Sequence, residues 1–351
     1  MKREQLLPSD VIKRNFPSNI IEEDKYLFNN EINKNFDKSY YYILNNTSIT
    51  FFGYVFKNFK LITKFYFIKY DKISNIIKKI KIYFYFYFFK LFSMNKNVHK
   101  GIYIFDGNSN SYFHWLCDTL IKLEILEKEK LFNNYPIIIP SRFYNSNLKY
   151  ILKIYKKKFI KINFFCRLFL RRLIIIDLLR PSGNYDPKTI LGFREKLLLQ
   201  SKKKNFSQYN GIYISRKKAK KRSEINFLEI EQILLKNKIY IFESEKYSLA
   251  EQISICSNFN FIIGVHGAGL SNMLWIKKKS SVLELRFEGD KYNNCYFSLA
   301  NILKFNYNYL LCKKNEFKNF NNSNIKVDCN KLEKTIKHII NETNNSINDN
   351  T

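Results

Sequence analysis

The chain has 351 residues, of which 46% are hydrophobic, and its 60 Lys and Arg against 30 Asp and Glu give a formal net charge of +30. This composition excludes a disordered chain, and the length favours two domains over one. The six cysteines show neither metal-site nor disulfide-framework spacing, so we expect a protein of the reducing cytoplasm.

The positive charge has two explanations. A basic surface attracts nucleic acid, anionic lipid or phosphorylated substrates. The chain is also rich in Lys, Asn, Ile, Phe and Tyr, which A/T-rich codons encode, and codon bias alone produces such a charge. A non-enzymatic nucleic-acid-binding protein stays open as an alternative, although no RNP-like run or zinc-ligand spacing supports it.

The N-terminal part of the chain contains no recognisable motif. No apolar signal-peptide core opens it, and the most apolar stretch, Ile82 to Phe92, is far shorter than the ~18 residues of a membrane-spanning helix. The stretch fits either a buried aromatic strand or a patch on a membrane face, with Lys79, Lys81 and Lys90 beside it. The second alternative adds peripheral attachment to the inner membrane to the expected cytoplasmic location.

The sequence from Gly101 onward predicts α/β structure. Strands are predicted at 102–105, 136–139 and 172–177, and helices at 112–126 and 147–157. Leu116, Leu120 and Leu123 recur at the spacing of a buried helical face. A turn-rich segment and a polar stretch then mark a domain junction. We place the domains at 1–200 and 201–340, with a frayed polar tail at 341–351.

The second half alternates strands with helices. Strands are predicted at 211–215, 239–242, 259–265, 282–285 and 307–311. Helices are predicted to open at Asn226 and Ser248, each with a matching Glu as in a capping box, and to cover 270–276 and 292–304. This alternation predicts a parallel sheet covered by helices on both faces.

The most specific feature is a strand that runs into a small-residue loop, followed by a helix. The loop and its flanks hold His266, Gly267, Ala268, Gly269 and Asn272. Ligands bind outside the carboxyl ends of parallel strands, and the next helix offers unpaired N–H groups and a positive dipole end. Small residues let a phosphate approach the backbone, and His266 can donate to a phosphate oxygen or a sugar hydroxyl. The alternative is a tight turn with a structural histidine.

Two further residues belong to the same predicted sheet edge. Arg216 directly follows the strand at 211–215, and its rigid fork suits the oxygens of a diphosphate. The lysines after it fit a solvated charge run. Glu284 lies on the strand after the loop, where a carboxylate can accept both hydroxyls of a ribose. Its alternative is an edge residue paired with Arg286.

A polar pair opens the predicted helix at 112–126. His114 and Asp118 are four residues apart, so they share one helical face. Either side chain could take a proton from a substrate hydroxyl. The alternative is a structural His–Asp pair that caps the helix start.

Three stretches together resemble glycosyltransferase family 61, whose bacterial members include capsular-polysaccharide enzymes. They are an HW-L-x-D pattern at His114, Trp115, Leu116 and Asp118; Ser215 and Arg216 with Arg222, Asn226 and Glu229; and the segment from Ser248 through the 266–272 loop to Glu284. The resemblance covers roughly residues 101–340. It implies a two-domain GT-B fold, in which Rossmann-like domains with parallel sheets face a cleft. It also implies an inverting mechanism and a nucleotide-sugar donor, and it adds Arg222 to the donor site.

The predicted mechanism divides the work between the domains. The N-terminal domain holds the acceptor and the base, with Asp118 as base and His114 orienting the acceptor, or the reverse. The C-terminal domain binds the nucleotide, and Arg216, His266 and the helix N-terminus after Gly269 stabilise the leaving diphosphate. The sequence contains no D-x-D motif, so we expect metal-independent transfer without a cofactor.

The predicted activity is transfer of a hexose or pentose to a glycan or lipid-linked acceptor, in the synthesis of surface polysaccharide such as capsule. A polysaccharide pyruvyl transferase-like enzyme is the enzymatic alternative. It would release no nucleoside diphosphate from a sugar nucleotide.

Overall fold

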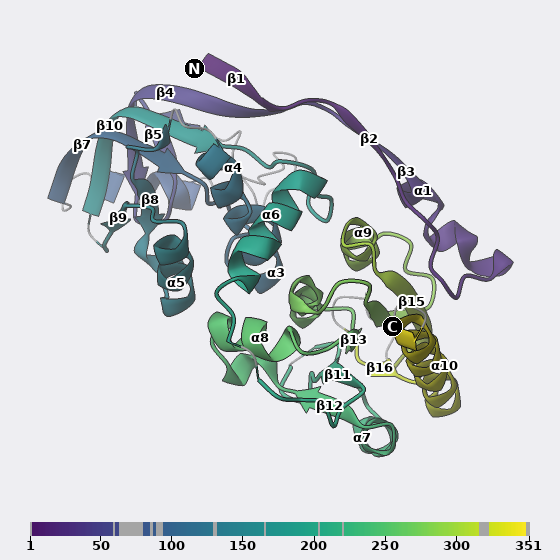
Figure 1. Cartoon of the computed structure of the whole chain (residues 1–351). Coiled ribbons are helices and arrows are strands. Elements are labelled where there is room, and N and C mark those ends of the chain that lie inside the picture. The colour runs from purple at the N-terminus through teal and green to yellow at the C-terminus, as the bar shows by residue number, and fades with distance from the viewer. Residues whose placement is uncertain are drawn as a thin grey trace. The chain divides into compact units, whose positions relative to one another are not determined.

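The computed structural model divides the chain into two compact units. Unit 1 comprises Met1–Asp10 and Asp37–Pro181, and unit 2 comprises Val11–Phe36 and Ser182–Thr351. The structure describes residues 2–58, 60–62, 80–84, 87–88, 94–128, 132–164, 166–202, 204–219, 221–315 and 323–348. Figure 1 shows the elements of each unit in chain order.

Unit 1 is built on a mixed sheet, which is eight-stranded in the described part of the chain, in the order β6-β5-β4-β10-β7-β8-β9 with β1 also paired to β4. Its strands are β1 (Lys2–Leu7), β4 (Ser39–Thr50), β5 (Val55–Lys57), β6 (Lys60–Leu61), β7 (Met94–Tyr103), β8 (Ile137–Pro140), β9 (Phe159–Ile162) and β10 (Cys166–Ile176). The strands β10, β7, β8 and β9 are parallel, whereas β4 runs antiparallel to β10. The antiparallel half comes from the N-terminal region, where the sequence offered no motif.

The helices of unit 1 that follow β7 include α3 (Tyr112–His114), a π-helical segment (Trp115–Leu120), α4 (Lys122–Lys128) and α5 (Ser146–Ile154). Leu116, Leu120 and Leu123 are fully buried, as predicted. The buried amine of Lys122 donates to the backbone oxygens of Ile104 at 2.8 Å and Ile176 at 3.3 Å. These bonds tie the helix to the carboxyl ends of β7 and β10.

Unit 2 contains the predicted sheet, which is six-stranded in the described residues, in the order β12-β11-β13-β14-β15-β16. Its strands are β11 (Gly211–Ile214), β12 (Ile239–Phe242), β13 (Phe261–Val265), β14 (Ser281–Phe287), β15 (Asn306–Lys314) and β16 (Ile325–Lys326). All neighbours pair in parallel except β15 and β16. The prediction of α/β structure with parallel strands is therefore confirmed in both sheets.

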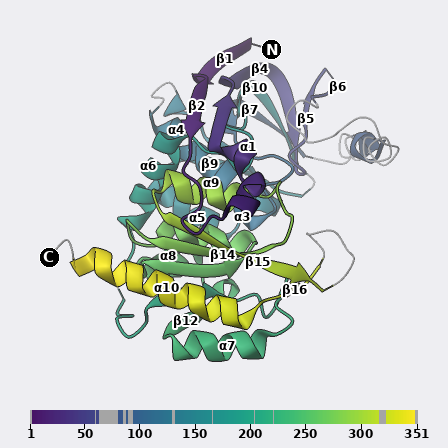
Figure 2. The ribbon, with the colours of Figure 1, turned by 90° about the vertical axis from the view of Figure 1, so that its right-hand side faces the viewer.

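Helices cover both faces of the sheet in unit 2 (Figure 2). Outside the N-terminal arm, the described α-helices of unit 2 are α6 (Pro187–Leu198), α7 (Phe227–Lys236), α8 (Leu249–Cys256), α9 (Cys295–Ile302) and α10 (Cys329–Asn348). Leu234 of α7 and Ile336 of α10 share one buried cluster with the sheet residues Tyr213 and Leu283. The helices α7 and α10 therefore cover the same face.

Only one of the two predicted capping boxes is present. Ser248 and Glu251 exchange both bonds of a capping box at the start of α8. The box predicted at Asn226 is wrong, because this side chain forms no cap bond with α7. Its amide instead binds both backbone polar groups of Val327 and so ties the start of α7 to the segment after β16.

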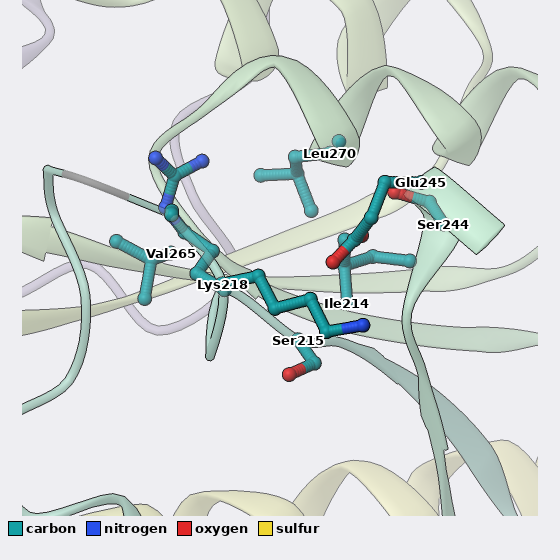
Figure 3. Close-up of a pocket in the computed structure, with 10 residues that line it drawn as sticks. Ile214, Ser215, Lys218, Ser244, Glu245, Val265 and Leu270 are labelled. Carbon is teal, nitrogen blue, oxygen red and sulfur yellow. The ribbon is translucent and has the colours of Figure 1, made fainter.

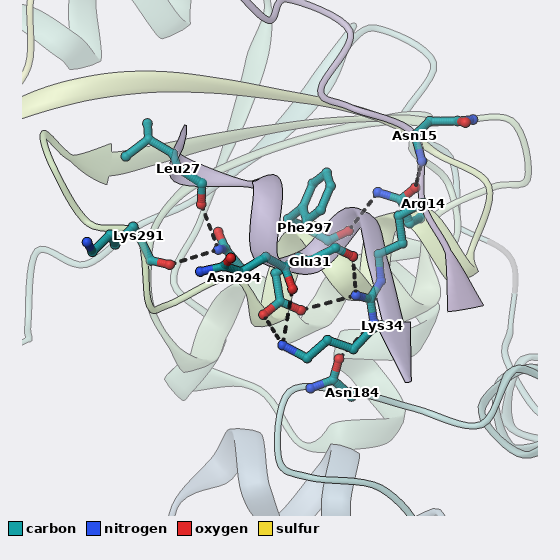
Figure 4. A network of polar contacts seen from close by, with 11 residues as sticks. Arg14, Asn15, Leu27, Glu31, Lys34, Asn184, Lys291, Asn294 and Phe297 are labelled. Atoms are coloured by element: carbon teal, nitrogen blue, oxygen red, sulfur yellow. Dashed lines mark hydrogen bonds and ion pairs between the residues drawn. The ribbon is translucent and has the colours of Figure 1, made fainter. Parts of the chain in front are cut away.

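An N-terminal arm, Val11–Phe36, belongs to unit 2. It contains most of β2 (Asp10–Lys13), a 3₁₀ turn (Glu22–Leu27), α1 (Asn29–Ile32) and β3 (Asn33–Phe36). Figure 4 shows Arg14, which donates to Glu31 within the arm and at 2.7 Å to Asn184 outside it. In the same network Asn294 donates to the backbone oxygen of Leu27 at 2.9 Å. The arm is thus fixed by contacts far apart in the sequence.

The apolar stretch at 82–92 lies partly outside the described residues, as do Lys79 and Lys90. Residues 82–84 and 87–88 are helical, so the strand alternative is wrong for this described portion. Within the described residues, no helix combines the length and apolar character needed to cross a membrane.

Candidate functional site

A pocket of about 250 Å³ lies at the carboxyl edge of the sheet in unit 2 (Figure 3). Its walls come from the residues that end or follow β11, β12 and β13, namely Ile214, Ser215, Arg216, Lys218, Ala219, Ser244, Glu245, Val265, Gly269 and Leu270. This is the edge at which open parallel sheets bind ligands. Arg216 and Gly269 are the predicted donor-site residues that line it.

Arg216 is held in place by the loop that follows it. Its Nε donates to the backbone oxygen of Arg222 at 3.0 Å, and its Nη2 donates to that of Lys221 at 2.8 Å. Arg222 has a φ of 56°, a left-handed conformation that turns the loop back toward Arg216. Among the described residues, Nη1 of Arg216 has no hydrogen-bond partner, so this nitrogen is available to donate to a ligand.

Gly267 makes room for the guanidinium of Arg216. A Cβ built on Gly267 would lie 2.2 Å from Nη1 of Arg216, a distance that no real pair of such atoms adopts. Burial lowers the pKa of Arg216, and the charge of Arg222 lowers it further, yet an arginine keeps its charge at neutral pH. The structure therefore brings a positive charge, held by backbone carbonyls, against the backbone of the predicted loop.

The helix after the loop begins earlier than predicted. A 3₁₀ helix covers Ala268–Trp275, so the predicted start at residue 270 is wrong, and Ala268 and Gly269 belong to the first turn. A Cβ on Gly269 would lie 2.7 Å from Cγ2 of Ile214, which explains the glycine. The first N–H groups of a helix have no intrahelical acceptor, and these belong to the turn that borders the pocket.

His266 is part of a buried chain of hydrogen bonds rather than of the pocket wall. Its Nδ1 lies 2.5 Å from Oε1 of Glu284. The hydroxyl of Tyr307 donates to the other carboxylate oxygen, and Nη1 of Arg286 donates to that hydroxyl at 3.2 Å. Because a carboxylate only accepts, Nδ1 carries a proton and the orientation of the ring is fixed. Nε2 can then donate to a phosphate only when the ring is positively charged.

Glu284 is fully buried on β14. Burial acts to raise its pKa, but the charge and hydrogen bond of His266 hold that pKa below its usual value. Both carboxylate oxygens are engaged, and Arg286 reaches Glu284 through the hydroxyl of Tyr307. The ribose contact predicted for Glu284 stays a prediction, and in this geometry the residue orients His266.

Asn272 is buried beneath the first turn of the 3₁₀ helix. Its Nδ2 donates to the backbone oxygen of Gly269 at 3.1 Å, and its side chain is fully buried. Together with Gly267 and Ala268, it lies outside the set of residues that line the pocket. As the side chains lie here, Asn272 shapes the turn and does not face the pocket.

The polar pair of unit 1 forms as the sequence predicts. Nδ1 of His114 lies 2.7 Å from Oδ2 of Asp118, with the side chain of His114 30% exposed and that of Asp118 5% exposed. The hydrogen bond that His114 donates to Asp118 raises the pKa of His114, against the effect of burial. The pair spans the junction of α3 and the π-helical segment, an irregularity that is frequent at functional sites.

The preceding loop is fixed to the same helix. The hydroxyls of Ser109 and Thr119 share a hydrogen bond of 2.7 Å. Asp106 accepts from the backbone N–H groups of Asn108 at 2.8 Å and Ser109 at 3.0 Å. This loop therefore holds its shape beside His114 without a ligand.

Sequence reasoning missed Glu245 and Tyr307. Glu245 follows β12, and Figure 3 shows its carboxylate turned into the pocket. The position of a polar residue after a predicted strand could have indicated it. The contact of Tyr307 with Glu284 could be found only from the register between β14 and β15, in which Tyr307 pairs with Val282.

In the described part of the chain, His, Cys, Asp and Glu side chains do not gather in groups of three or more that could hold a metal ion. Metal independence itself stays a prediction.

A comparison with protein families matches residues 112–283 to the model described as Glycosyltransferase 61. The match begins at the helix of His114 and Asp118 and includes Arg216 and the 266–269 loop, so the resemblance seen in the sequence is confirmed. No curated protein matches the chain.

Proposed function

Because the chain belongs to the Glycosyltransferase 61 family through residues 112–283, it is a glycosyltransferase, and we propose that it is an inverting enzyme with a nucleotide-sugar donor. The acceptor that we propose is a glycan or a lipid-linked saccharide of surface polysaccharide synthesis. Family membership favours glycosyl transfer over the pyruvyl-transfer alternative.

The observation that carries the donor proposal is the guanidinium of Arg216 against Gly267 at the rim of the pocket. A diphosphate placed there would accept from Nη1 of Arg216 and from the first N–H groups of the 268–275 helix. These donors are preorganised, because backbone carbonyls already hold the guanidinium. They would stabilise the charge that develops on the leaving diphosphate.

The other wall of the pocket suits a nucleoside. Ile214, Val265 and Leu270 supply apolar surface, while Ser244 and Glu245 supply hydroxyl and carboxylate groups. Glu245 is exposed and turned into this space (Figure 3). We assign to Glu245 the ribose contact first predicted for Glu284, and to Glu284 the orientation of His266.

The acceptor base is proposed to come from unit 1, as in the two halves of a GT-B enzyme. His114 is the more exposed member of its pair with Asp118, and its imidazole titrates close to neutral pH. We therefore propose that His114 takes the proton of the acceptor hydroxyl. Asp118 holds the ring and stabilises the imidazolium that forms.

Donor binding is tested by calorimetric titration of Arg216→Ala, after a screen of nucleotide sugars for ligand-induced thermal shift. Loss of this charged contact is expected to weaken donor affinity by about ten- to a hundredfold. Lys217→Ala is the matched control, because Lys217 is the exposed neighbour and does not line the pocket. Unchanged affinity in Arg216→Ala would place the diphosphate elsewhere.

A further inference from the structure

A second pocket, of about 200 Å³, lies in unit 1 beside the helix of His114 and Asp118. Its walls come from the 106–111 loop, the start of that helix and the segment after β8. Tyr112 and Trp115 supply the aromatic surface, and Ser109, Asn110, Arg142 and Asn145 supply polar groups. This pocket lies below the ~300–1,000 Å³ of a drug-sized site, which is consistent with one sugar ring.

The aromatic wall suits the apolar face of a sugar. The rings of Tyr112 and Trp115 are stacked, with centroids 6.0 Å apart and planes inclined by 30°. Trp115 is 6% exposed, and its indole N–H has no hydrogen-bond partner among the described residues. A buried donor without a partner is costly and therefore uncommon in a native protein. Trp115 lines the pocket, so this unpaired donor belongs to a residue beside the space that a ligand would fill.

The polar wall carries a positive charge that the described residues do not neutralise. Arg142 is exposed, lies over the ring of Phe143 at 4.4 Å and forms no ion pair in the described part of the chain. The amide of Asn145 accepts from the backbone N–H of Leu148 at 2.8 Å. This bond fixes the side chain of Asn145 at the pocket wall. A guanidinium fork pairs best with a carboxylate, which it can bind through two parallel hydrogen bonds.

We propose that this pocket is an acceptor subsite for a sugar that carries a carboxylate, a uronic acid by chemical class. The ring lies against Tyr112 and Trp115, and the carboxylate pairs with Arg142. The subsite adjoins the helix of His114, so it would hold one residue of the acceptor close to the proposed base. This proposal rests on the proposed function, because it takes unit 1 as the acceptor side.

The test is direct binding to the full-length protein without a donor. Methyl glucuronoside and methyl glucoside are titrated by calorimetry into the wild type, Arg142→Gln and Arg171→Gln. Arg171 is a matched control, since it is an exposed arginine of β10 that does not line the pocket. We expect the wild type and Arg171→Gln to bind the glucuronoside about tenfold or more tightly than the glucoside, and Arg142→Gln to lose that preference.

Tryptophan fluorescence shows whether the glucuronoside binds in the pocket that Trp115 lines. The chain has two tryptophans, and Trp275 is fully buried in unit 2. In Trp275→Phe, the emission comes from Trp115, and the glucuronoside is expected to change it in a saturable way. If this variant does not fold, loss of glucuronoside affinity in Trp115→Phe replaces the measurement.

Equal affinity for the two glycosides in the wild type would overturn the proposal, as would a preference that survives in Arg142→Gln. Titration of a nucleoside diphosphate in the same samples separates the two proposals. If the diphosphate binds and the glucuronoside does not, only the acceptor subsite is wrong.

Discussion

His114 and Asp118 share one hydrogen bond but differ in exposure, and this difference gives each a separate role. The neutral form of His114 accepts the proton, so the rate should fall as the pH drops through its pKa. The hydrogen bond that His114 donates to Asp118 raises that pKa above 6.5. In Asp118→Asn, kcat should fall by about 10²–10⁴-fold, and the acid limb of the kcat/KM profile should move to lower pH.

A pH–rate profile of both proteins checks this prediction, with donor affinity as the control for an intact fold. If the acid limb of Asp118→Asn stays at the same pH as in the wild type, the group that titrates there is not His114, and His114 is not the base. The stabilising effect of the pair has the opposite pH dependence. Because the pKa of His114 is higher in the folded protein than in the unfolded chain, the pair stabilises the fold fully at a pH below the pKa of the unfolded state. This stabilisation is lost as the pH rises through the pKa of the folded state.

The predicted positions of His114, Asp118 and Arg216 agree with the structure, while their roles stay predictions. His114 and Asp118 meet because they are one helical turn apart, and Arg216 meets the 266–269 loop because β11 and β13 are neighbours. The partner of Glu284 was missed because Tyr307 comes from the next strand, and only the strand register brings the two together.

The turn between β13 and the 268–275 helix positions Arg216. In Gly267→Ala, the new methyl group would collide with the guanidinium, since the Cβ would lie 2.2 Å from Nη1. Donor affinity should fall by about as much as in Arg216→Ala, ten- to a hundredfold, with little loss of thermal stability. Calorimetric titration measures the affinity, and Gly107→Ala is the control because its Cβ would meet nothing within 4 Å. Wild-type donor affinity in Gly267→Ala would show that Arg216 is not held by this turn.

Many of the elements after residue 100 could be predicted because they bury a regular apolar pattern, but β9, β16 and α10 were not among them. Ser248 caps α8 as its local sequence predicts, but Asn226 does not cap α7, since the backbone of Val327 offers it two partners. The strands of the N-terminal region were not predictable in the same way. The strand β4 is defined by its antiparallel pairing with β10, and the N-terminal arm is fixed by contacts such as Arg14 with Asn184.

On the scale of the whole molecule, the net charge of +30 favours an anionic surface as one partner. Ile80, Phe84, Tyr87 and Phe88 are exposed apolar side chains beside Lys81. We propose that this segment attaches the enzyme to an anionic membrane surface, so that the protein floats with anionic liposomes at low salt. Phe84→Ser with Phe88→Ser should reduce flotation, whereas Leu199→Ser, a similarly exposed site in unit 2, should not. Full recovery of the wild type in the soluble fraction would contradict the proposal.

The proposed function requires that this glycosyltransferase draws its sugar from a nucleotide sugar. The most direct measurement follows nucleoside diphosphate release by NMR, with a panel of nucleotide sugars and oligosaccharide acceptors, with and without EDTA. We expect release from one donor together with a new glycosidic linkage of inverted anomeric configuration, at a rate that EDTA does not change. EDTA inhibition reversed by manganese would overturn metal independence alone. Consumption of phosphoenolpyruvate, with every nucleotide sugar left intact, would rule out transfer from a nucleotide sugar.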